Sequence, residues 1–125
     1  MYLFYAQQIT LDNDTECFII EKKEDNRWKV IATQAKLKEG DQTNEKDIET
    51  IGETITEGLF VSFASLISAV KYSRIYVRTM KMDIRIIRCI IPKGNAWSGT
   101  DAFRDKNLYG CKQLTKIDIA ETLRK

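Results

Sequence analysis

Aromatic and β-branched residues dominate residues 2–11, and three short polar side chains follow them at residues 12–14. Because such side chains bond to their own backbone and favour turns, this pattern predicts a first strand that ends there. Two more β-rich runs, residues 17–20 and 28–31, flank a polar stretch at residues 24–26. Their spacing is that of a β-hairpin, so the start of the chain predicts a strand followed by a hairpin.

Apolar residues return at helical spacing after a polar loop, at Ile48, Ile51 and Ile55. Asn44 stands where a helix N-cap is expected, and a glycine follows where a helix end favours a left-handed residue. The pattern therefore predicts a short first helix, although Gly52 in its interior lowers the helix propensity.

A second helix is predicted to start after Ser62, which can cap its N-terminus. Four apolar residues share one side of this helix: Leu66, Ile67, Val70 and Val77. That side is expected to pack on a sheet, because an amphipathic helix buries its apolar stripe.

Residues 83–91 form an almost continuous β-branched run that stops at Pro92, which is typical of a central strand buried on both faces. Residues 94–112 show neither the helical nor the strand period, and so long a loop in a compact domain is usually functional. Residues 115–119 then alternate β-branched and charged side chains, which predicts a last, half-exposed strand.

These elements predict an α+β fold, in which a mixed or mostly antiparallel sheet contains the β-hairpin and carries two packed helices. A length of 125 residues with 43% hydrophobic side chains suits one domain over residues 1–125. No internal repeat and no linker-like stretch divides the sequence.

Charge and cysteine content indicate which partners and which cellular compartment to expect. The 20 basic and 18 acidic side chains give a net charge of +2, far from the basicity of a typical nucleic-acid-binding domain. Cys17, Cys89 and Cys111 are odd in number and widely spaced, and the chain opens without a secretory signal. Its apolar runs are far shorter than a membrane span. We expect a cytoplasmic protein with free, structural thiols that does not enter a membrane.

Histidine is absent from the chain, which removes the usual general base, the commonest metal ligand and every Ser-His or Cys-His nucleophile pair. The cysteines form no C-x-x-C pair, and no glycine-rich phosphate loop is present. The sequence therefore predicts no catalytic residue, no metal site and no cofactor, and it favours a binding protein over an enzyme.

Aromatic residues and cations are interspersed through residues 94–112, where Trp97, Phe103 and Tyr109 lie among side chains such as Arg104. Aromatic rings among cations suit an interface with a protein, or stacking on a nucleic-acid base. The alternative is that these rings cover an edge of the sheet. We expect this segment to bind a protein partner, with Trp97 and Tyr109 as the first contacts.

A basic stripe is expected on the second helix, where Lys71, Arg74, Arg78 and Lys81 recur at steps of three or four residues. Such a stripe can grip phosphates, but cations near a helix C-terminus are also favoured by the helix dipole and can simply face water. Lys71, Arg74 and Arg78 join the aromatic segment as candidate partner-binding residues. Glutamates at every fourth position of residues 45–57 can face water, or they can pair with a basic patch on a partner or with this stripe, and the last pairing would permit a homo-oligomer.

Short motifs follow one another in the second half of the chain: F-V-S-F at residues 60–63, A-V-K-Y-S-R at 69–74, R-C-I-I-P-K-G at 88–94, W-S-G at 97–99 and Y-G-C at 109–111. This order resembles small proteins of bacteriophages and other mobile elements that have an I-P-K-G strand end. The resemblance implies a non-enzymatic accessory protein that binds another macromolecule, either a host protein to be inhibited or a virion component. It places the protein in the host cytoplasm or in the virion.

The same order is similar to the C-terminal part of ADP-ribosyltransferase-like domains, where these elements build a nicotinamide cleft. This second resemblance implies a degenerate relative that binds or cleaves a nucleotide, with Tyr5, Ser62 and Gln113 lining one pocket. Enzymes of that class use a His or Arg on an early strand and a Glu beside the last strand. This chain has Gln7 and Gln8 at the first place and Gln113 at the second, so the original chemistry is expected to be lost.

Overall fold

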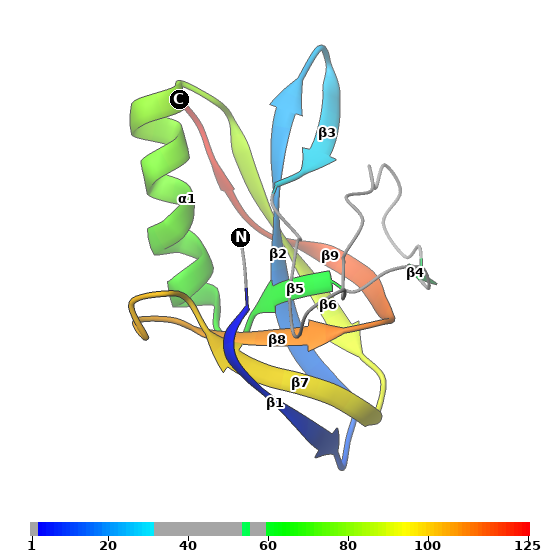
Figure 1. The fold of residues 1–125 in the computed structure, drawn as a ribbon. Coiled ribbons are helices and arrows are strands. Elements are labelled where there is room, and N and C mark those ends of the chain that lie inside the picture. The colour runs from blue at the N-terminus through cyan, green and yellow to red at the C-terminus, as the bar shows by residue number, and fades with distance from the viewer. Residues whose placement is uncertain (1–2, 32–53, 56–59) are drawn as a thin grey trace.

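The computed structural model describes residues 3–31, 54–55 and 60–125 of the chain (Figure 1). These residues form nine strands and one helix, in the order β1 (Phe4–Leu11), β2 (Thr15–Glu24), β3 (Arg27–Val30), β4 (Thr54–Ile55), β5 (Phe60–Phe63), α1 (Leu66–Met80), β6 (Ile84–Ile91), β7 (Gly94–Thr100), β8 (Asn107–Cys111) and β9 (Leu114–Leu123). The predicted first strand, the hairpin of β2 and β3, and the strands β6 and β9 are confirmed.

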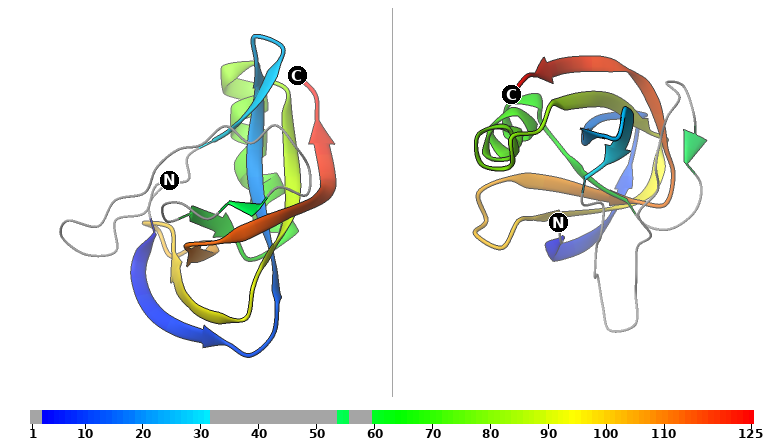
Figure 2. Two further views of the ribbon diagram at one scale, coloured as in Figure 1. Left: turned by 90° about the vertical axis from the view of Figure 1, so that its right-hand side faces the viewer. Right: turned by 90° about the horizontal axis from the view of Figure 1, so that it is seen from above.

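One sheet contains all the described strands, in the order β1-β7-β8-β5-β2-β6-β9-β4, with β3 paired to β2. Every registered pair is antiparallel, so the mostly antiparallel sheet is confirmed. β5 and β2 share one registered pair, Phe63 with Phe18, and the sheet turns at this corner. Figure 1 shows β5, β7 and β8 running across the direction of β2 and β6, and Figure 2 shows α1 against one side of this curved sheet.

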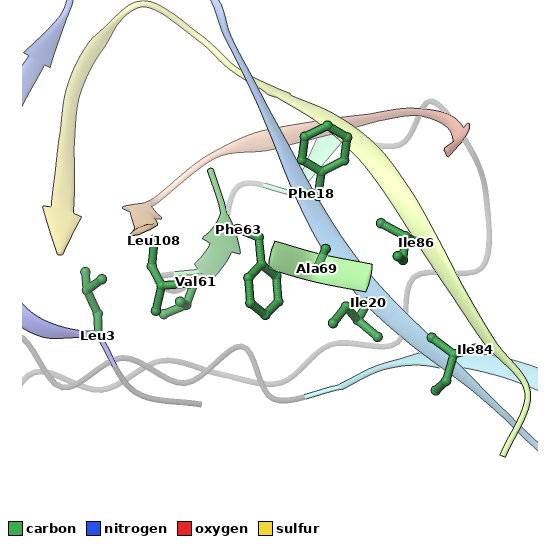
Figure 3. Close-up of a cluster of buried hydrophobic side chains, with 9 residues drawn as sticks. All are labelled: Leu3, Phe18, Ile20, Val61, Phe63, Ala69, Ile84, Ile86 and Leu108. Carbon is green, nitrogen blue, oxygen red and sulfur yellow. The ribbon is translucent and has the colours of Figure 1, made fainter. Parts of the chain in front are cut away.

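β2 and β6 form the centre of the molecule and bury side chains on both faces. Ile20 and Ile86 point to α1, whereas Ile19 and Ile87 point to the opposite face. The helix-side core, drawn in Figure 3, consists of Leu3, Phe18, Ile20, Val61, Phe63, Ala69, Ile84, Ile86 and Leu108. The second core consists of Cys17, Ile19, Val30, Phe60, Ile87, Cys89, Ile91, Cys111 and Leu114. The predicted burial of β6 on both faces is therefore confirmed.

Helix α1 begins later than the sequence predicts. Ser65, not Ser62, is its N-cap, and the Ser65 hydroxyl oxygen accepts a hydrogen bond from the backbone N–H of Ser68 at 3.2 Å. Ser62 instead lies in β5 and is fully buried. The strand extends this far because both of its faces pack on a core, Phe60 on the second core and Phe63 on the helix-side core.

The buried stripe of α1 centres on two small residues, Ala69 and Ser73. The Ser73 hydroxyl donates a hydrogen bond to the carbonyl of Ala69 at 2.7 Å, so this buried polar group has a partner. Leu66, Val70 and Val77 pack beside the stripe as predicted, but Ile67 is 68% exposed. Each residue turns a helix by about 100°, which carries Ile67 well away from the stripe.

The predicted first helix falls mainly outside the described residues. Its described part, Thr54–Ile55, forms the short strand β4, which pairs with Leu114 and Thr115 of β9. Both residues of β4 are β-branched and suit a strand, so pairing with β9 overrides the helical spacing here. The described part of the chain thus has one helix on the sheet rather than two, and no helix there is long and apolar enough to cross a membrane.

Residues 94–112 form the hairpin of β7 and β8 instead of the predicted long loop. The alternation of apolar and polar side chains that would indicate strands is interrupted by glycines, which stand where another part of the chain approaches closely. A Cβ atom at Gly99 would lie 2.5 Å from the carbonyl oxygen of Phe4, and one at Gly110 would lie 2.9 Å from the side chain of Leu3. The two glycines therefore make room for Leu3 and Phe4, where β1 begins.

β9 reverses the alternation that the sequence suggests. Lys116 is fully buried, whereas Ile117 is 44% exposed and Ile119 is 47% exposed. The register between β9 and β6 shifts twice, and each shift leaves one extra residue in β9, first Ile117 and then Ala120. These two bulges reset which side chains point inward, and simple alternation along the sequence does not reveal them.

Candidate functional site

The turn between β7 and β8, residues 101–106, is held in place by the side chain and backbone of Asp101. The Asp101 carboxylate accepts hydrogen bonds from the backbone N–H groups of Asp105 at 2.7 Å and Lys106 at 3.1 Å. Its carbonyl accepts a hydrogen bond from the N–H of Arg104 at 3.1 Å. This hairpin tip is therefore an ordered loop, because its own polar groups satisfy its backbone.

The hairpin tip presents the ring of Phe103 to solvent, and its neighbour Arg104 contacts β1, which exposes two more rings. Phe103 is 89% exposed, Tyr5 is 57% exposed and Phe4 is 41% exposed. The Arg104 guanidinium lies 4.0 Å from the centre of the Tyr5 ring, and the ring centres of Tyr5 and Phe4 are 6.5 Å apart. We call Phe4, Tyr5, Phe103 and Arg104 the aromatic patch.

Two residues of the aromatic patch have strained backbones. Tyr5 has a φ of 54° and Arg104 a φ of 55°, both in the left-handed region that large side chains rarely adopt. Such a conformation costs about 1 to 3 kcal/mol per residue and tends to occur at functional sites. The two strained residues are the partners of the cation–π contact, so the surrounding chain fixes the shape of the patch.

The basic stripe of α1 begins beside the hairpin tip. Lys71, Arg74 and Arg78 are all exposed on this helix. The Lys106 ammonium donates a hydrogen bond to Asp105 at 2.9 Å and lowers the pKa of that carboxyl, and the charge of Lys71 lowers this pKa further. Lys71 is thus close enough to act on the tip, and Figure 1 shows the β7–β8 turn next to the start of α1.

Trp97 and Tyr109 lie on opposite faces of the β7–β8 hairpin. Trp97 is paired with Gly110 and packs, partly buried, against the helix-side core. Tyr109 is paired with Ser98 and packs against the second core. The structure therefore does not bring these two rings together, and of the three aromatic residues expected to bind a partner, Phe103 is the one that the tip exposes.

The residues expected to line a nucleotide pocket also lie apart. Tyr5 is at the tip end of the β7–β8 hairpin, where Arg104 contacts it, whereas Gln113 follows β8 at the other end. Ser62 is fully buried in β5, and its hydroxyl has no hydrogen-bond partner among the described residues. The structure does not gather these three side chains into one site.

A buried cluster of charges, which the sequence patterns miss, joins β2, β6 and β9 beside the second core. The Glu21 carboxylate accepts hydrogen bonds from Arg85 Nε at 2.5 Å and from Lys116 Nζ at 2.8 Å. Glu21 and Lys116 are fully buried, and the Arg85 guanidinium lies 4.5 Å from the centre of the Trp28 ring. The one available signal is the alternation of β2, which gives Glu21 the same inward direction as Ile19.

The three cysteines are free and buried, as expected of structural thiols, and all belong to the second core. Cys17 stands directly opposite Cys89 in the register of β2 and β6. A hydrogen bond with Cys17 and burial raise the pKa of Cys89, and burial raises the pKa of Cys111, so these two thiols stay protonated. Within the described ranges, no group of three or more Cys, Asp or Glu side chains is placed to hold a metal ion.

Comparison with known proteins yields no match to a family model, to a curated protein or to a solved structure. Function therefore has to be argued from the surface of the chain itself. The aromatic patch is the strongest candidate, because it combines high exposure, an ordered loop and two strained residues in contact.

Proposed function

We propose that this protein is a non-enzymatic accessory protein that binds a protein partner through the aromatic patch. The observation that carries the proposal is the 89% exposure of Phe103 on a hairpin tip that Asp101 holds in place. Apolar patches that stay exposed on an ordered surface are typical of interaction sites. Phe103 would enter a pocket on the partner, with Tyr5 and Arg104 beside it.

The ordered hairpin tip favours binding because little conformational order has to be created. A loop that already has its bound shape loses less entropy on association than a flexible one. Full burial of a phenylalanine side chain contributes about 1.5 to 3 kcal/mol. Tyrosine and arginine are among the residue types that dominate interface energies, and the patch supplies one of each.

The charge of the hairpin tip favours a protein over a polyanion. Lys106 forms ion pairs with Asp101 at 3.8 Å and Asp105 at 2.9 Å. Arg104, the other cation of the tip, stacks on Tyr5. Two carboxylates thus balance two cations, and the tip has no excess positive charge to attract phosphates.

The resemblance to bacteriophage proteins supports a partner that is either a host protein to be inhibited or a neighbouring virion component. The hairpin tip lies between two of the motifs that carry this resemblance, W-S-G at residues 97–99 and Y-G-C at residues 109–111. A search for the partner therefore begins with phage-infected bacteria.

The test compares immobilised wild-type protein with Phe103→Ala and Ile67→Ala variants in an extract of phage-infected bacteria. Ile67 is the matched control, because it is an apolar residue that is 68% exposed on α1. We expect wild type and Ile67→Ala to retain the same partner, which is then purified and titrated by calorimetry. Phe103→Ala should weaken this binding by about 2 kcal/mol, or roughly thirtyfold, with unchanged thermal unfolding.

Equal affinity of Phe103→Ala and wild type for the purified partner would move the contact away from the aromatic patch. A failure of all three proteins to retain a specific partner would contradict the proposal. Trp97→Ala serves as a further comparison, because its ring packs on the helix-side core. That variant should lower folding stability, while the fraction that remains folded binds as wild type does.

A further inference from the structure

A pocket of about 330 Å³ lies at the end of α1, between the turn of β2 and β3 and the connection from α1 to β6. Three lysines from three parts of the chain line it: Lys23, Lys81 and Lys125. Two carboxylates, Asp25 and Asp83, also face it. In Figure 1 this region is at the top, at the opposite end of α1 from the hairpin tip.

The walls of this lysine pocket are held together by two hydrogen bonds, both from backbone N–H groups to Asp83. The N–H of Lys23 donates to the carbonyl of Asp83 at 3.0 Å, and the N–H of Lys125 donates to the Asp83 carboxylate at 2.9 Å. Lys81 ends the helix in the left-handed conformation, with φ 56° and ψ 44°. Three separate segments are therefore held around one opening.

None of the three lysines has an ion pair with another residue in the described part of the chain. Other cations do find partners there, such as Lys22 with Glu24 at 3.1 Å. One oxygen of the Asp83 carboxylate is already engaged by the N–H of Lys125. The ammonium groups of Lys23, Lys81 and Lys125 are thus available to an anion from solution.

The lysine pocket continues into the basic stripe of α1. Lys81 is both a wall of the pocket and the last residue of the series Lys71, Arg74, Arg78 and Lys81. Lys81 lies ten positions after Lys71, which corresponds to about 15 Å along the helix axis. A row of exposed cations of this length that ends in a pocket fits a polymer of regularly spaced anions better than one small ion.

We propose that the lysine pocket and the basic stripe bind the phosphate backbone of a single-stranded nucleic acid. Lysine and arginine are the side chains that contact phosphates most often. Beyond Lys81, where the helix ends, the further cations of the pocket are Lys23 and Lys125, which do not belong to α1, so a bound chain has to bend there. A single strand can follow such a bend. A duplex cannot do so easily, because its persistence length is about 150 base pairs.

The test is a fluorescence anisotropy titration with a labelled single-stranded RNA of about 20 nucleotides, over about 50 to 200 mM salt. The variant Lys23→Gln/Lys81→Asn removes two pocket charges, and asparagine tolerates the left-handed conformation at the helix end. The control Lys93→Gln/Lys112→Gln removes two exposed charges elsewhere. Both variants change the net charge equally, so bulk electrostatics cannot distinguish them.

We expect wild type and the control to bind the RNA alike. The pocket variant should bind about tenfold more weakly, and the slope of log affinity against log salt should fall by about 1.4, or 0.7 for each lost phosphate contact. Equal losses in the two variants, or no binding by wild type at the lowest salt, would overturn the proposal.

Two further probes separate the nucleic acid from other anions. A DNA duplex of equal length should bind more weakly than the single strand, and equal binding with the same loss in the pocket variant would contradict the choice of a single strand. A labelled polyglutamate peptide should bind only weakly. Tighter binding of this peptide than of RNA would assign the pocket to acidic proteins instead.

Discussion

At the scale of single residues, burial and charge conflict most strongly at Glu21, Arg85 and Lys116. Removing charged groups from water costs several kcal/mol, which only their mutual pairing offsets. Lys116→Met keeps an apolar stem in place but leaves the Glu21 carboxylate with Arg85 as its described cationic partner. We expect the free energy of unfolding, measured by urea titration, to fall by about 3 kcal/mol.

The double variant Glu21→Leu/Lys116→Met provides the matched comparison, because both fully buried charges are then removed together. It should lose less stability than the Lys116→Met and Glu21→Leu single variants combined, since it leaves no fully buried charge unpaired. Arg85 loses its contact with Glu21 in both Glu21→Leu and the double variant, so that loss does not alter the comparison. Strictly additive losses would show that the two groups do not stabilise each other.

Lys116 also shows why some buried residues escape sequence interpretation. The local pattern of residues 115–119 correctly predicts a strand, but it gives no reason to place a lysine inside. The reason is Glu21, which lies 95 positions away along the chain and supplies the opposite charge. Pairing over such a distance depends on the sheet order, which no local period contains.

At the scale of elements, the β7–β8 hairpin depends on two glycines that differ in how tightly they are packed. An added Cβ at Gly99 would meet the backbone oxygen of Phe4, which cannot move freely, whereas at Gly110 it would meet the flexible end of Leu3. Gly99→Ala should therefore lower the free energy of unfolding by about 1 to 3 kcal/mol. Gly110→Ala should cost less, and thermal unfolding of the two variants measures the difference.

Gly99→Ala should also displace the start of β1, which carries Phe4 and Tyr5 of the aromatic patch. Amide chemical shifts of both residues in NMR spectra would report this displacement. Unchanged shifts together with wild-type stability would mean that β1 does not rest on Gly99 as closely as the structure has it.

Elements with a strong local period are the ones that the sequence predicts well. The β-branched run of β6 and the apolar stripe of α1 are both formed by residues close together in the sequence. The type and approximate bounds of these two elements can therefore be predicted. The hairpin of β7 and β8 is missed because glycines and small side chains replace the usual alternation. The short strand β4 is missed because its pairing with β9, not its own spacing, decides its conformation.

At the scale of the whole molecule, the two cores share the strands β2 and β6 and should unfold together. Ile87 is fully buried in the second core, away from α1. Ile87→Ala should cost about 2 to 5 kcal/mol. Far-UV circular dichroism, which reports α1, and tryptophan fluorescence should show the same shifted transition, because one sheet carries both cores.

Ile119 is the matched control for this prediction, because it stands opposite Ile87 in the register of β6 and β9 but is 47% exposed. Ile119→Ala should cost less than about 1 kcal/mol. A helix signal that stays at the wild-type midpoint in Ile87→Ala would instead show that the two cores unfold independently.

The candidate site is only partly predictable from the sequence, because it depends on contacts between segments that are far apart along the chain. Composition alone draws attention to Phe103 and Arg104, because aromatic residues among cations are typical of interfaces. It cannot show that Trp97 and Tyr109 face two different cores, since that depends on the register between β7 and β8. Nor can it show that Tyr5, far away in the sequence, lies under the Arg104 guanidinium.

The two bulges of β9 restrict how the length of this chain can change during evolution. Each bulge absorbs one residue, so that Lys116 and Leu123 both keep their places against β6. A slip of one residue sends every following side chain of a strand to the opposite face. A deletion of one residue between Lys116 and Leu123 would therefore carry Leu123 away from the helix-side core, against which it packs. Among descendants of this gene, β9 should keep a constant length while turns between strands gain and lose residues.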